Sequence, residues 1–329
     1  MTDRLLVFAP NWLGDAVMAL PALADVRQSR PSATIDVAAR SSIAPLFTLV
    51  PDINGVLTIG KGRASVSPIR EGRYDAALLL TNSFNTARLV WSAGIPERWG
   101  YRTDFRSLLL TKGITPPTRV HQGEYYRRLA QALGFITGRE ATVPRLNVSA
   151  EQRAAGLALL TGEGWDGRTP LVALAPGAAF GGAKRWPATS FAATADGLAK
   201  DGIGAVLIGT SADRGAATEV LAATNTHTRS INLVGRTDLP ALAGVLLQCR
   251  ALLTNDSGAM HLAAALGVAV TAMFGPTRER ETHPLGTGHT VLTNPVWCRP
   301  CMLRECPLTH RCMTGITVDA VLAATRARL

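Results

Sequence analysis

The carboxylate of Asp15 is the first group along this chain that could carry chemistry. It closes the loop Asn11-Trp-Leu-Gly-Asp15, which follows the apolar run Leu5–Ala9 and precedes a helical pattern from Ala16 onward. Asp is a favoured helix cap, and its position alone would explain it. Open parallel sheets, however, bind ligands at the carboxyl ends of their strands, where a carboxylate can take a proton from a hydroxyl. The sequence leaves both interpretations open.

A second loop, Pro176–Trp186, combines glycines with adjacent positive charges. Gly177 and its neighbours permit a close approach of the backbone to a ligand, and Lys184 and Arg185 bring cations to the same place. A diphosphate would fit such a loop, and so would an exposed turn with a solvated Lys-Arg pair. The loop is neither a Walker A motif nor a G-x-G-x-x-G fingerprint, which argues against a kinase, an NTPase or a nicotinamide dehydrogenase.

A third loop, Thr254–His261, joins an expected strand to an apolar helix. Backbone N–H groups at Ser257 and Gly258, together with the helix dipole, favour an anion at this turn. Asp256 would repel phosphate, so we expect it to hold the loop or to accept from a sugar hydroxyl. His261 can donate a hydrogen bond here, and a satisfied core histidine is an equally good interpretation.

Basic residues cluster in the first half of the chain. They are Lys61, Arg63, Arg70, Arg73, Arg98, Arg102, Arg106 and Lys112. Arginine suits bidentate contacts to carboxylates and phosphates, so Arg63, Arg98 and Arg102 are candidates for binding an acidic ligand.

Four of the five cysteines are crowded near the carboxyl end, at Cys298, Cys301, Cys306 and Cys312. They are weak candidates for a zinc or iron–sulfur site, because their spacing matches no standard framework. Reduced thiols or a disulfide are the favoured interpretations.

The elements that must position these residues read as alternating strands and helices, typical of parallel sheets. The expected strands are Leu5–Ala9, Ile35–Ala38, Gly55–Ile59, Ala76–Leu80, Leu171–Ala175, Ala205–Ile208, Ile231–Val234, Ala251–Thr254, Val268–Phe274 and Thr290–Leu292. The opening strand and loop at 5–15 resemble those at 171–181, which indicates two Rossmann-like domains. The breaker-rich stretch at 161–170 places the boundary there, giving domains 1–165 and 166–329.

The length and composition of the chain fit an α/β protein of two domains. The chain has 329 residues, 47% of them hydrophobic, and a net charge of +10, which favours anionic partners. No apolar run is long enough to span a bilayer and no signal peptide is visible, so we expect a soluble cytoplasmic protein. Nucleic acid is not expected as a partner, because aromatic residues make up only 5% and no binding motif is present.

The three loops together resemble the ADP-heptose:lipopolysaccharide heptosyltransferases, glycosyltransferase family 9. The marks are Asn11-Trp-Leu-Gly-Asp15, Pro176-Gly-Ala, Ala183-Lys-Arg-Trp-Pro187, Asn255-Asp-Ser-Gly-Ala-Met-His261 and Phe274-Gly-Pro-Thr277. The Asn-Trp opening and the Ala-Lys-Arg-Trp-Pro run are most similar to the members that add the second inner-core heptose. Ala179 departs from the pattern, since such loops often carry an acidic residue there.

The resemblance implies a GT-B fold, in which two Rossmann-like domains face a central cleft, and an inverting mechanism that needs no metal or other cofactor. It implies that Asp15 is the general base and that Lys184 binds the donor phosphates. The donor is then expected at Gly177, Lys184, Arg185, Asp256, Ser257, Gly258 and His261, and the acceptor at Asn11, Trp12, Arg63, Arg98 and Arg102. The expected partners are an ADP-sugar, an acidic lipopolysaccharide precursor and the surface of the inner membrane.

Two other functions stay open at this point. One is a non-catalytic, two-lobed protein that binds a polyanion or glycan, and the other is a GT-B transferase that uses a different nucleotide sugar.

Overall fold

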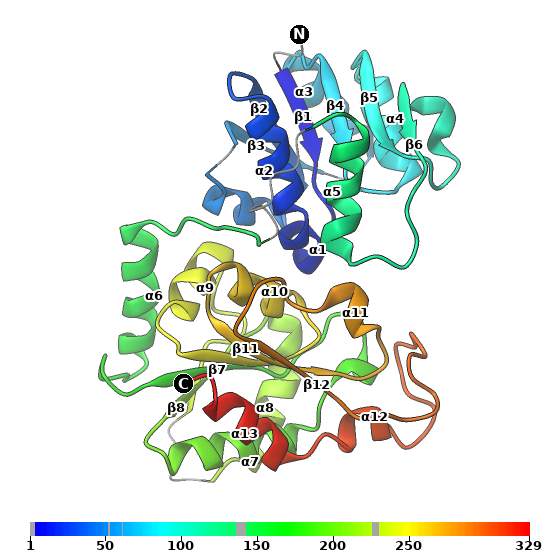
Figure 1. Ribbon diagram of the computed structural model, residues 1–329. Helices are drawn as coiled ribbons and strands as arrows, with labels where there is room; N and C mark the ends of the chain where they lie inside the picture. Colours follow the sequence, from blue (N-terminus) through cyan, green and yellow to red (C-terminus); the bar gives the residue numbers. More distant parts are fainter. Residues whose placement is uncertain (1–3, 52, 61, 136–142, 226–229) are drawn as a thin grey trace. The chain divides into compact units, whose positions relative to one another are not determined.

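The computed structural model describes residues 4–51, 53–60, 62–135, 143–225 and 230–329 (Figure 1). The chain divides into two compact units, Met1–Asn147 and Val148–Leu329. The predicted boundary at 165/166 is therefore wrong: it lies one helix too late, because α6 (Ala150–Gly162) belongs to the second unit.

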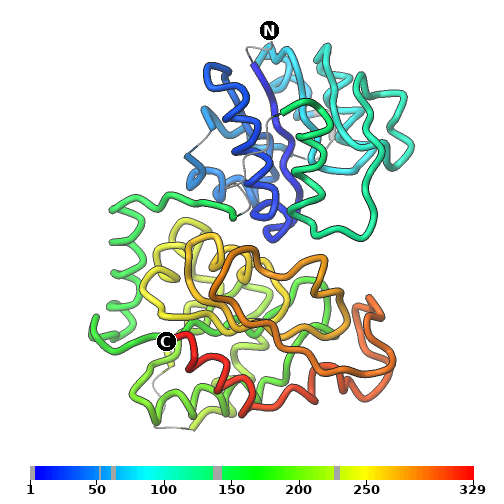
Figure 2. The backbone as a smooth tube through the Cα atoms, viewed as in Figure 1, coloured from blue at the N-terminus to red at the C-terminus, as the bar shows by residue number. Residues whose placement is uncertain are grey.

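Helix α6 joins the second unit through a very close helix–helix contact. It begins at a capping box in which Ser149 and Gln152 satisfy each other's backbone N–H groups. It then packs on α9 (Leu239–Leu246), where a Cβ on Gly156 would overlap the backbone of Gly244. The two helices thus approach backbone to backbone, and Figure 2 follows the chain through this helix into the second unit.

The first unit is built on a sheet of six parallel strands. They are β1 (Arg4–Phe8), β2 (Thr34–Arg40), β3 (Gly55–Ile59), β4 (Ala76–Leu79), β5 (Glu97–Tyr101) and β6 (Lys112–Ile114), in the order β3-β2-β1-β4-β5-β6. The first four confirm the predicted strands, whereas β5 and β6 were not predicted.

The helical elements of this unit alternate with its strands. They are α1 (Leu13–Met18), α2 (Leu20–Ser29), η1 (Ala44–Leu49), η2 (Gly62–Ser65), α3 (Val66–Glu71), α4 (Phe84–Ser92), η3 (Arg106–Leu109) and α5 (Gln122–Ala132). Helix α2 starts afresh with Pro21 in its first turn, as expected for a residue that cannot donate to the preceding turn. Arg127 on α5 makes an ion pair of 2.9 Å with Asp25, a fully buried residue of α2.

The second unit repeats the same architecture. Its strands are β7 (Leu171–Ala175), β8 (Gly204–Leu207), β9 (Ser230–Asn232), β10 (Ala251–Asn255), β11 (Ala269–Phe274) and β12 (His289–Thr293), in the order β12-β11-β10-β7-β8-β9 and all parallel. All six were predicted, with small shifts at their ends. The remaining elements are η4 (Gly182–Lys184), α7 (Ala188–Ala199), η5 (Ser211–Asp213), α8 (Arg214–Ala223), α10 (Gly258–Ala265), α11 (Glu279–Thr282), α12 (Arg311–Thr314) and α13 (Val318–Arg326).

Both sheets follow the Rossmann order, 3-2-1-4-5-6 when strands are counted within each unit. In such sheets the direction of winding reverses between the first and fourth strands, and ligands bind beyond the carboxyl ends of those strands. These positions follow β1 and β4 in the first unit, and β7 and β10 in the second. The three loops selected from the sequence follow three of these four strands. The predicted central cleft concerns the placement of the units relative to each other, and it stays a prediction.

Each sheet is covered by helices that close an apolar core. In the first unit the core includes Leu6, Phe8, Leu79 and Val90, and in the second it includes Leu174, Trp186, Phe191 and Met273. Within the described ranges no helix is both long and apolar enough to cross a membrane.

Candidate functional site

Asp15 is the third residue of α1 and does not cap it. The N-cap is Trp12, whose side chain makes no capping hydrogen bond, so the cap interpretation of Asp15 is not realised. Helix α5 packs against α1, and its buried Tyr126 lies near Asp15. Burial first, and the negative charge of Asp15 next, raise the pKa of Tyr126 well above its usual value. Asp15 itself is partly exposed at the carboxyl end of β1, where a proton acceptor could meet a ligand.

Asn11 and Trp12 lie in the same loop as predicted. Asn11 is half-buried, while Trp12 leaves 61% of its surface exposed. An exposed indole at a sheet's ligand-binding edge is available for stacking on a sugar ring.

The structure separates the three arginines predicted to bind an acceptor. Arg98 is the second residue of β5 and donates to the backbone carbonyls of Leu109, Ile95 and Pro96 over 2.7, 2.6 and 2.9 Å. Its guanidinium therefore braces the chain near the start of β5, at the opposite edge from Asp15. The geometry contradicts an acceptor-binding role for Arg98.

The structure bears differently on the acceptor-binding roles predicted for Arg102 and Arg63. Arg102 follows β5 directly and is exposed at the same sheet edge as Asp15, which is compatible with binding an acceptor. The backbone of Arg63 lies in η2, and its side chain falls outside the described part of the structure.

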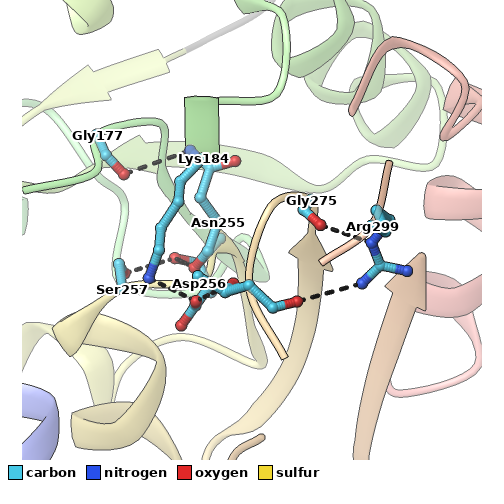
Figure 3. Close-up of polar contacts among 9 residues, drawn as sticks. Gly177, Lys184, Asn255, Asp256, Ser257, Gly275 and Arg299 are labelled. Atoms are coloured by element: carbon cyan, nitrogen blue, oxygen red, sulfur yellow. Dashed lines mark hydrogen bonds and ion pairs between the residues drawn. The ribbon is translucent and has the colours of Figure 1, made fainter. Parts of the chain in front are cut away.

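In the second unit, Lys184 and Asp256 join the loops after β7 and β10 (Figure 3). Lys184 Nζ lies 2.5 Å from Asp256 Oδ2, and both side chains are largely buried. Thr277 Oγ1 donates to the same carboxylate oxygen over 2.7 Å. The Lys184 ammonium also lies 4.9 Å from the centre of the Phe180 ring. Asp256 thus holds the lysine in place, which agrees with the loop-holding role expected for it.

Asn255 fixes the backbone around this pair, and the sequence motif did not reveal its role. It is fully buried, its Oδ1 accepts from the N–H of Trp186 over 2.9 Å, and its Nδ2 donates to the carbonyl of Pro176 over 2.8 Å. One side chain therefore clamps both ends of the loop that carries Lys184. Trp186 anchors that loop further, because its indole is buried and donates to the carbonyl of Ile316.

Helix α10 begins at the same edge of the sheet. Its N-cap is Ser257, whose hydroxyl lies 3.0 Å from Thr254 Oγ1 and makes no capping hydrogen bond to the helix. The first turn, from Gly258, therefore keeps backbone N–H groups that an anion can use. His261 is buried within this helix, as the core interpretation of that residue expects.

Gly177 and Arg185 complete the predicted donor set. Gly177 is buried, and a Cβ there would overlap the carboxylate of Asp213, so the loop needs a glycine at this point. Arg185 is exposed beside the buried Trp186.

Arg299 supports the Lys184–Asp256 pair indirectly, through the turn that carries Thr277. It was not predicted from the sequence. Its Nε donates to the carbonyl of Gly275 over 2.5 Å (Figure 3). Its Nη2 lies 3.0 Å from Glu279 Oε2. These contacts hold the turn after β11 that carries Thr277, and Thr277 in turn binds Asp256. The Gly-Pro-Thr sequence could have marked Thr277, but nothing in the sequence pairs Arg299 with this turn.

The four-cysteine segment packs against the Lys184 loop. The carbonyl of Arg304 accepts from Ala183 N over 2.9 Å, Glu305 accepts from Gly182 N over 2.9 Å, and His310 Nε2 lies 2.7 Å from the carbonyl of Ala183. Its cysteines are unbonded. Among the described residues, no three His, Cys, Asp or Glu side chains are placed to hold a metal.

Comparisons with known proteins agree on one family. A family model described as glycosyltransferase family 9 (heptosyltransferase) matches residues 63–311. The chain is 34% identical to lipopolysaccharide heptosyltransferase 2 of Escherichia coli K12, covering 86% of this chain and 85% of the relative. It is 32% identical to lipooligosaccharide heptosyltransferase 2 of Haemophilus ducreyi, covering 86% of each. The solved structure of E. coli ADP-heptose lps heptosyltransferase II superimposes with a TM-score of 0.85 at 32% identity, covering 98% of both chains.

Proposed function

The chain belongs to glycosyltransferase family 9 and has a GT-B type fold, and on this premise we propose that it transfers heptose from ADP-heptose to the lipopolysaccharide inner core. The acceptor in this proposal already carries the first heptose, by analogy with the relatives named heptosyltransferase 2. The observation that carries the proposal is the Lys184–Asp256 pair, which sits between the ligand-binding ends of β7 and β10.

The second unit supplies what an ADP-sugar donor requires. Lys184 presents a fixed cation, and the first turn of α10 presents N–H groups and the positive end of a helix dipole. Both can stabilise the negative charge that builds on a departing diphosphate. In this proposal no metal is required, and chelation with EDTA should leave the rate unchanged.

The first unit supplies the base. Asp15 takes the proton from an acceptor hydroxyl, whose oxygen attacks the anomeric carbon on the face opposite the diphosphate. The bond between that carbon and the diphosphate oxygen breaks, ADP leaves with the bonding electrons, and the new glycosidic bond has inverted configuration.

The acceptor is acidic, so it would use positive charge near Asp15. Arg102, at the end of β5, supports this role, and Asn11 and Trp12 border the same edge. We place the reaction at the cytoplasmic face of the inner membrane, where a lipid-anchored precursor would be presented.

The decisive test is ADP release from ADP-heptose in the presence of truncated lipopolysaccharide acceptors. We expect one ADP per acceptor that carries a single heptose, and little release with an acceptor that has no heptose. Release from another nucleotide sugar would assign a different donor. Tight acceptor binding without release from any donor would favour the non-catalytic alternative.

A further inference from the structure

The first unit exposes large apolar side chains beside the ligand-binding edge of its sheet. Phe105 and Leu108, around η3, leave 97% and 96% of their surfaces exposed. Phe84 and Trp91, on α4, are exposed as well. Helix α4 and η3 pack against each other, and the four exposed residues that they carry or adjoin are called here the exposed apolar face. Soluble proteins seldom leave such a face uncovered without a function for it.

The helix contributes to this face with a regular pattern. Phe84, Arg88 and Trp91 stand at positions i, i+4 and i+7 of α4, which lie along one side of a helix. A neighbouring side of α4 buries Ala87 and Val90 in the core of the unit. The outward stripe is therefore distinct from the stripe that holds the helix on the sheet.

The backbone before η3 is arranged so that Phe105 is exposed. Asp104 and Phe105 both adopt left-handed conformations, with φ of 50° and 56°, which cost free energy for residues other than glycine. Asp104 Oδ2 accepts from the N–H of Phe84 over 2.6 Å and ties this turn to the start of α4. The turn is thus pinned in a strained form that presents Phe105.

Arg106, the residue after Phe105, is anchored inside the unit. Its side chain is fully buried and donates to the carbonyls of Tyr101 and Thr81 over 2.9 and 2.6 Å. Leu109 packs inward against the core of the unit while Leu108 points outward. Asp104, Arg106 and Leu109 thus fix the backbone around Phe105 and Leu108. The fold itself therefore keeps these two side chains exposed.

Three arginines lie on or beside the exposed apolar face. Arg88 lies on it, Arg102 precedes the strained turn, and Arg70 donates to the carbonyl of Ser92 next to Trp91. All three arginines are exposed. Exposed apolar side chains with cations among them are typical of proteins that rest on anionic bilayers, where the apolar groups enter the headgroup region and the cations attract lipid phosphates.

We propose that the exposed apolar face docks the protein on an anionic lipid bilayer. A second copy of the chain fits less well, because a twofold contact through this face would bring the arginines of both copies together. The face begins at the carboxyl end of β4, which is next to β1 in the sheet, so docking would bring the bilayer to the edge that carries Asp15. The proposed function already places the reaction at a membrane, and this inference names the surface of the protein that would meet it.

Vesicle flotation tests the proposal without donor or acceptor. Wild-type protein should float with vesicles of phosphatidylethanolamine and phosphatidylglycerol, and much less with vesicles of phosphatidylcholine alone. The double variant F105S/L108S should bind about tenfold more weakly or less, since it removes two apolar side chains from the interface. Arg88→Glu should weaken binding about fivefold or more, and only at low salt.

A matched control comes from the second unit. Trp297 is 90% exposed there, and Trp297→Ser should float like the wild type. Because the substituted side chains are exposed, the melting temperatures should stay unchanged; if the double variant fails to fold, Arg88→Glu decides the question. Equal flotation of all variants would overturn the proposal, and so would a wild-type dimer that F105S/L108S converts to a monomer.

A rate assay separates this proposal from the proposed function. If both hold, F105S/L108S transfers heptose normally to a water-soluble truncated acceptor and slowly to an acceptor in vesicles. If docking holds and the proposed function fails, the wild type floats but releases no ADP with either acceptor.

Discussion

The ion pair between Lys184 and Asp256 sets the charge that an incoming diphosphate would meet. A carboxylate beside a phosphate site is unfavourable unless a cation neutralises it, and Lys184 does so at 2.5 Å. Thr277 donates to the same oxygen and keeps the carboxylate turned toward the lysine. In the proposed reaction the lysine therefore has two tasks: it balances Asp256 and it offers its remaining protons to the donor.

Lys184→Met should raise the KM for ADP-heptose by about a hundredfold, because it leaves Asp256 buried and unneutralised. Adding Asp256→Asn should recover part of that loss by removing the repulsion, although the cation is still missing. Steady-state kinetics with varied donor measure both variants. If the double variant is no better than Lys184→Met, Asp256 has no electrostatic effect on the donor.

Asp15→Asn keeps the size of the side chain and removes its ability to take a proton. It should lower kcat by about 10²–10⁴-fold. The affinity for ADP should stay unchanged in calorimetric titration, because Lys184 and α10 belong to the other unit. Near-normal turnover in this variant would exclude Asp15 as the base.

The cysteines should differ in their reactivity. Burial raises the pKa of Cys249 to about 12, and burial together with neighbouring cysteines also raises the pKa of Cys312. A raised pKa leaves less thiolate at any given pH, and the thiolate is the form that reacts. Iodoacetamide at pH 8 should therefore modify the partly exposed Cys298, Cys301 and Cys306 first, as followed by mass spectrometry. Protection of these three, with stoichiometric zinc or iron, would indicate a metal site.

The site residues that could be predicted from sequence are those in short motifs that follow a strand. Lys184, Asp256 and Ser257 were selected this way, because the end of a strand is visible in the sequence, and the structure places them after β7 and β10. Arg98 was assigned wrongly, because its strand was not recognised and nothing else told which edge of the sheet it occupies. Arg299 was missed because its contacts with Gly275 and Glu279 join segments more than 19 residues apart in sequence.

At the scale of elements, burial decided which strands could be predicted. Strands β7 and β10 are buried along their whole length and read as apolar runs. Strand β5 contains Glu97, Arg98 and Gly100, and β6 consists of Lys112, Gly113 and Ile114. These two lie at or next to the edge of the sheet, where partial exposure tolerates charge and hides the apolar pattern.

The contact between α6 and α9 permits a matched pair of substitutions. Gly156→Ala places a methyl group against the backbone of Gly244 and should lower the free energy of unfolding by about 1–3 kcal/mol. Gly162→Ala, in the same helix, meets nothing within 4 Å and should instead stabilise by about 0.5–1 kcal/mol through better helix propensity. Urea unfolding measures both. Equal stability of the two variants would mean that the helices can move apart freely.

At the scale of the molecule, the predicted boundary between the units was misplaced. Helix-breaking residues mark where a helix ends, but they do not show which unit the helix packs against. The glycine-rich stretch after α6 ends that helix, yet α6 packs on α9. Only the tertiary contact shows that α6 belongs with the strands that follow it. The repeated order of strands, by contrast, could be anticipated from the similar strand and loop that open each unit.

This boundary predicts how fragments of the chain should behave. A fragment of residues 148–329 keeps α6 and every residue proposed to bind the donor, so it should unfold cooperatively and bind ADP with nearly the affinity of the whole chain. A fragment of residues 166–329 lacks α6 and exposes the apolar surface of α9 that α6 covers, so it should unfold at lower urea and aggregate. Urea titration and calorimetry with ADP compare the two fragments. Equal stability of the two fragments would support a domain boundary at residue 165. Loss of ADP binding in both fragments would mean that the first unit also contributes to the donor site.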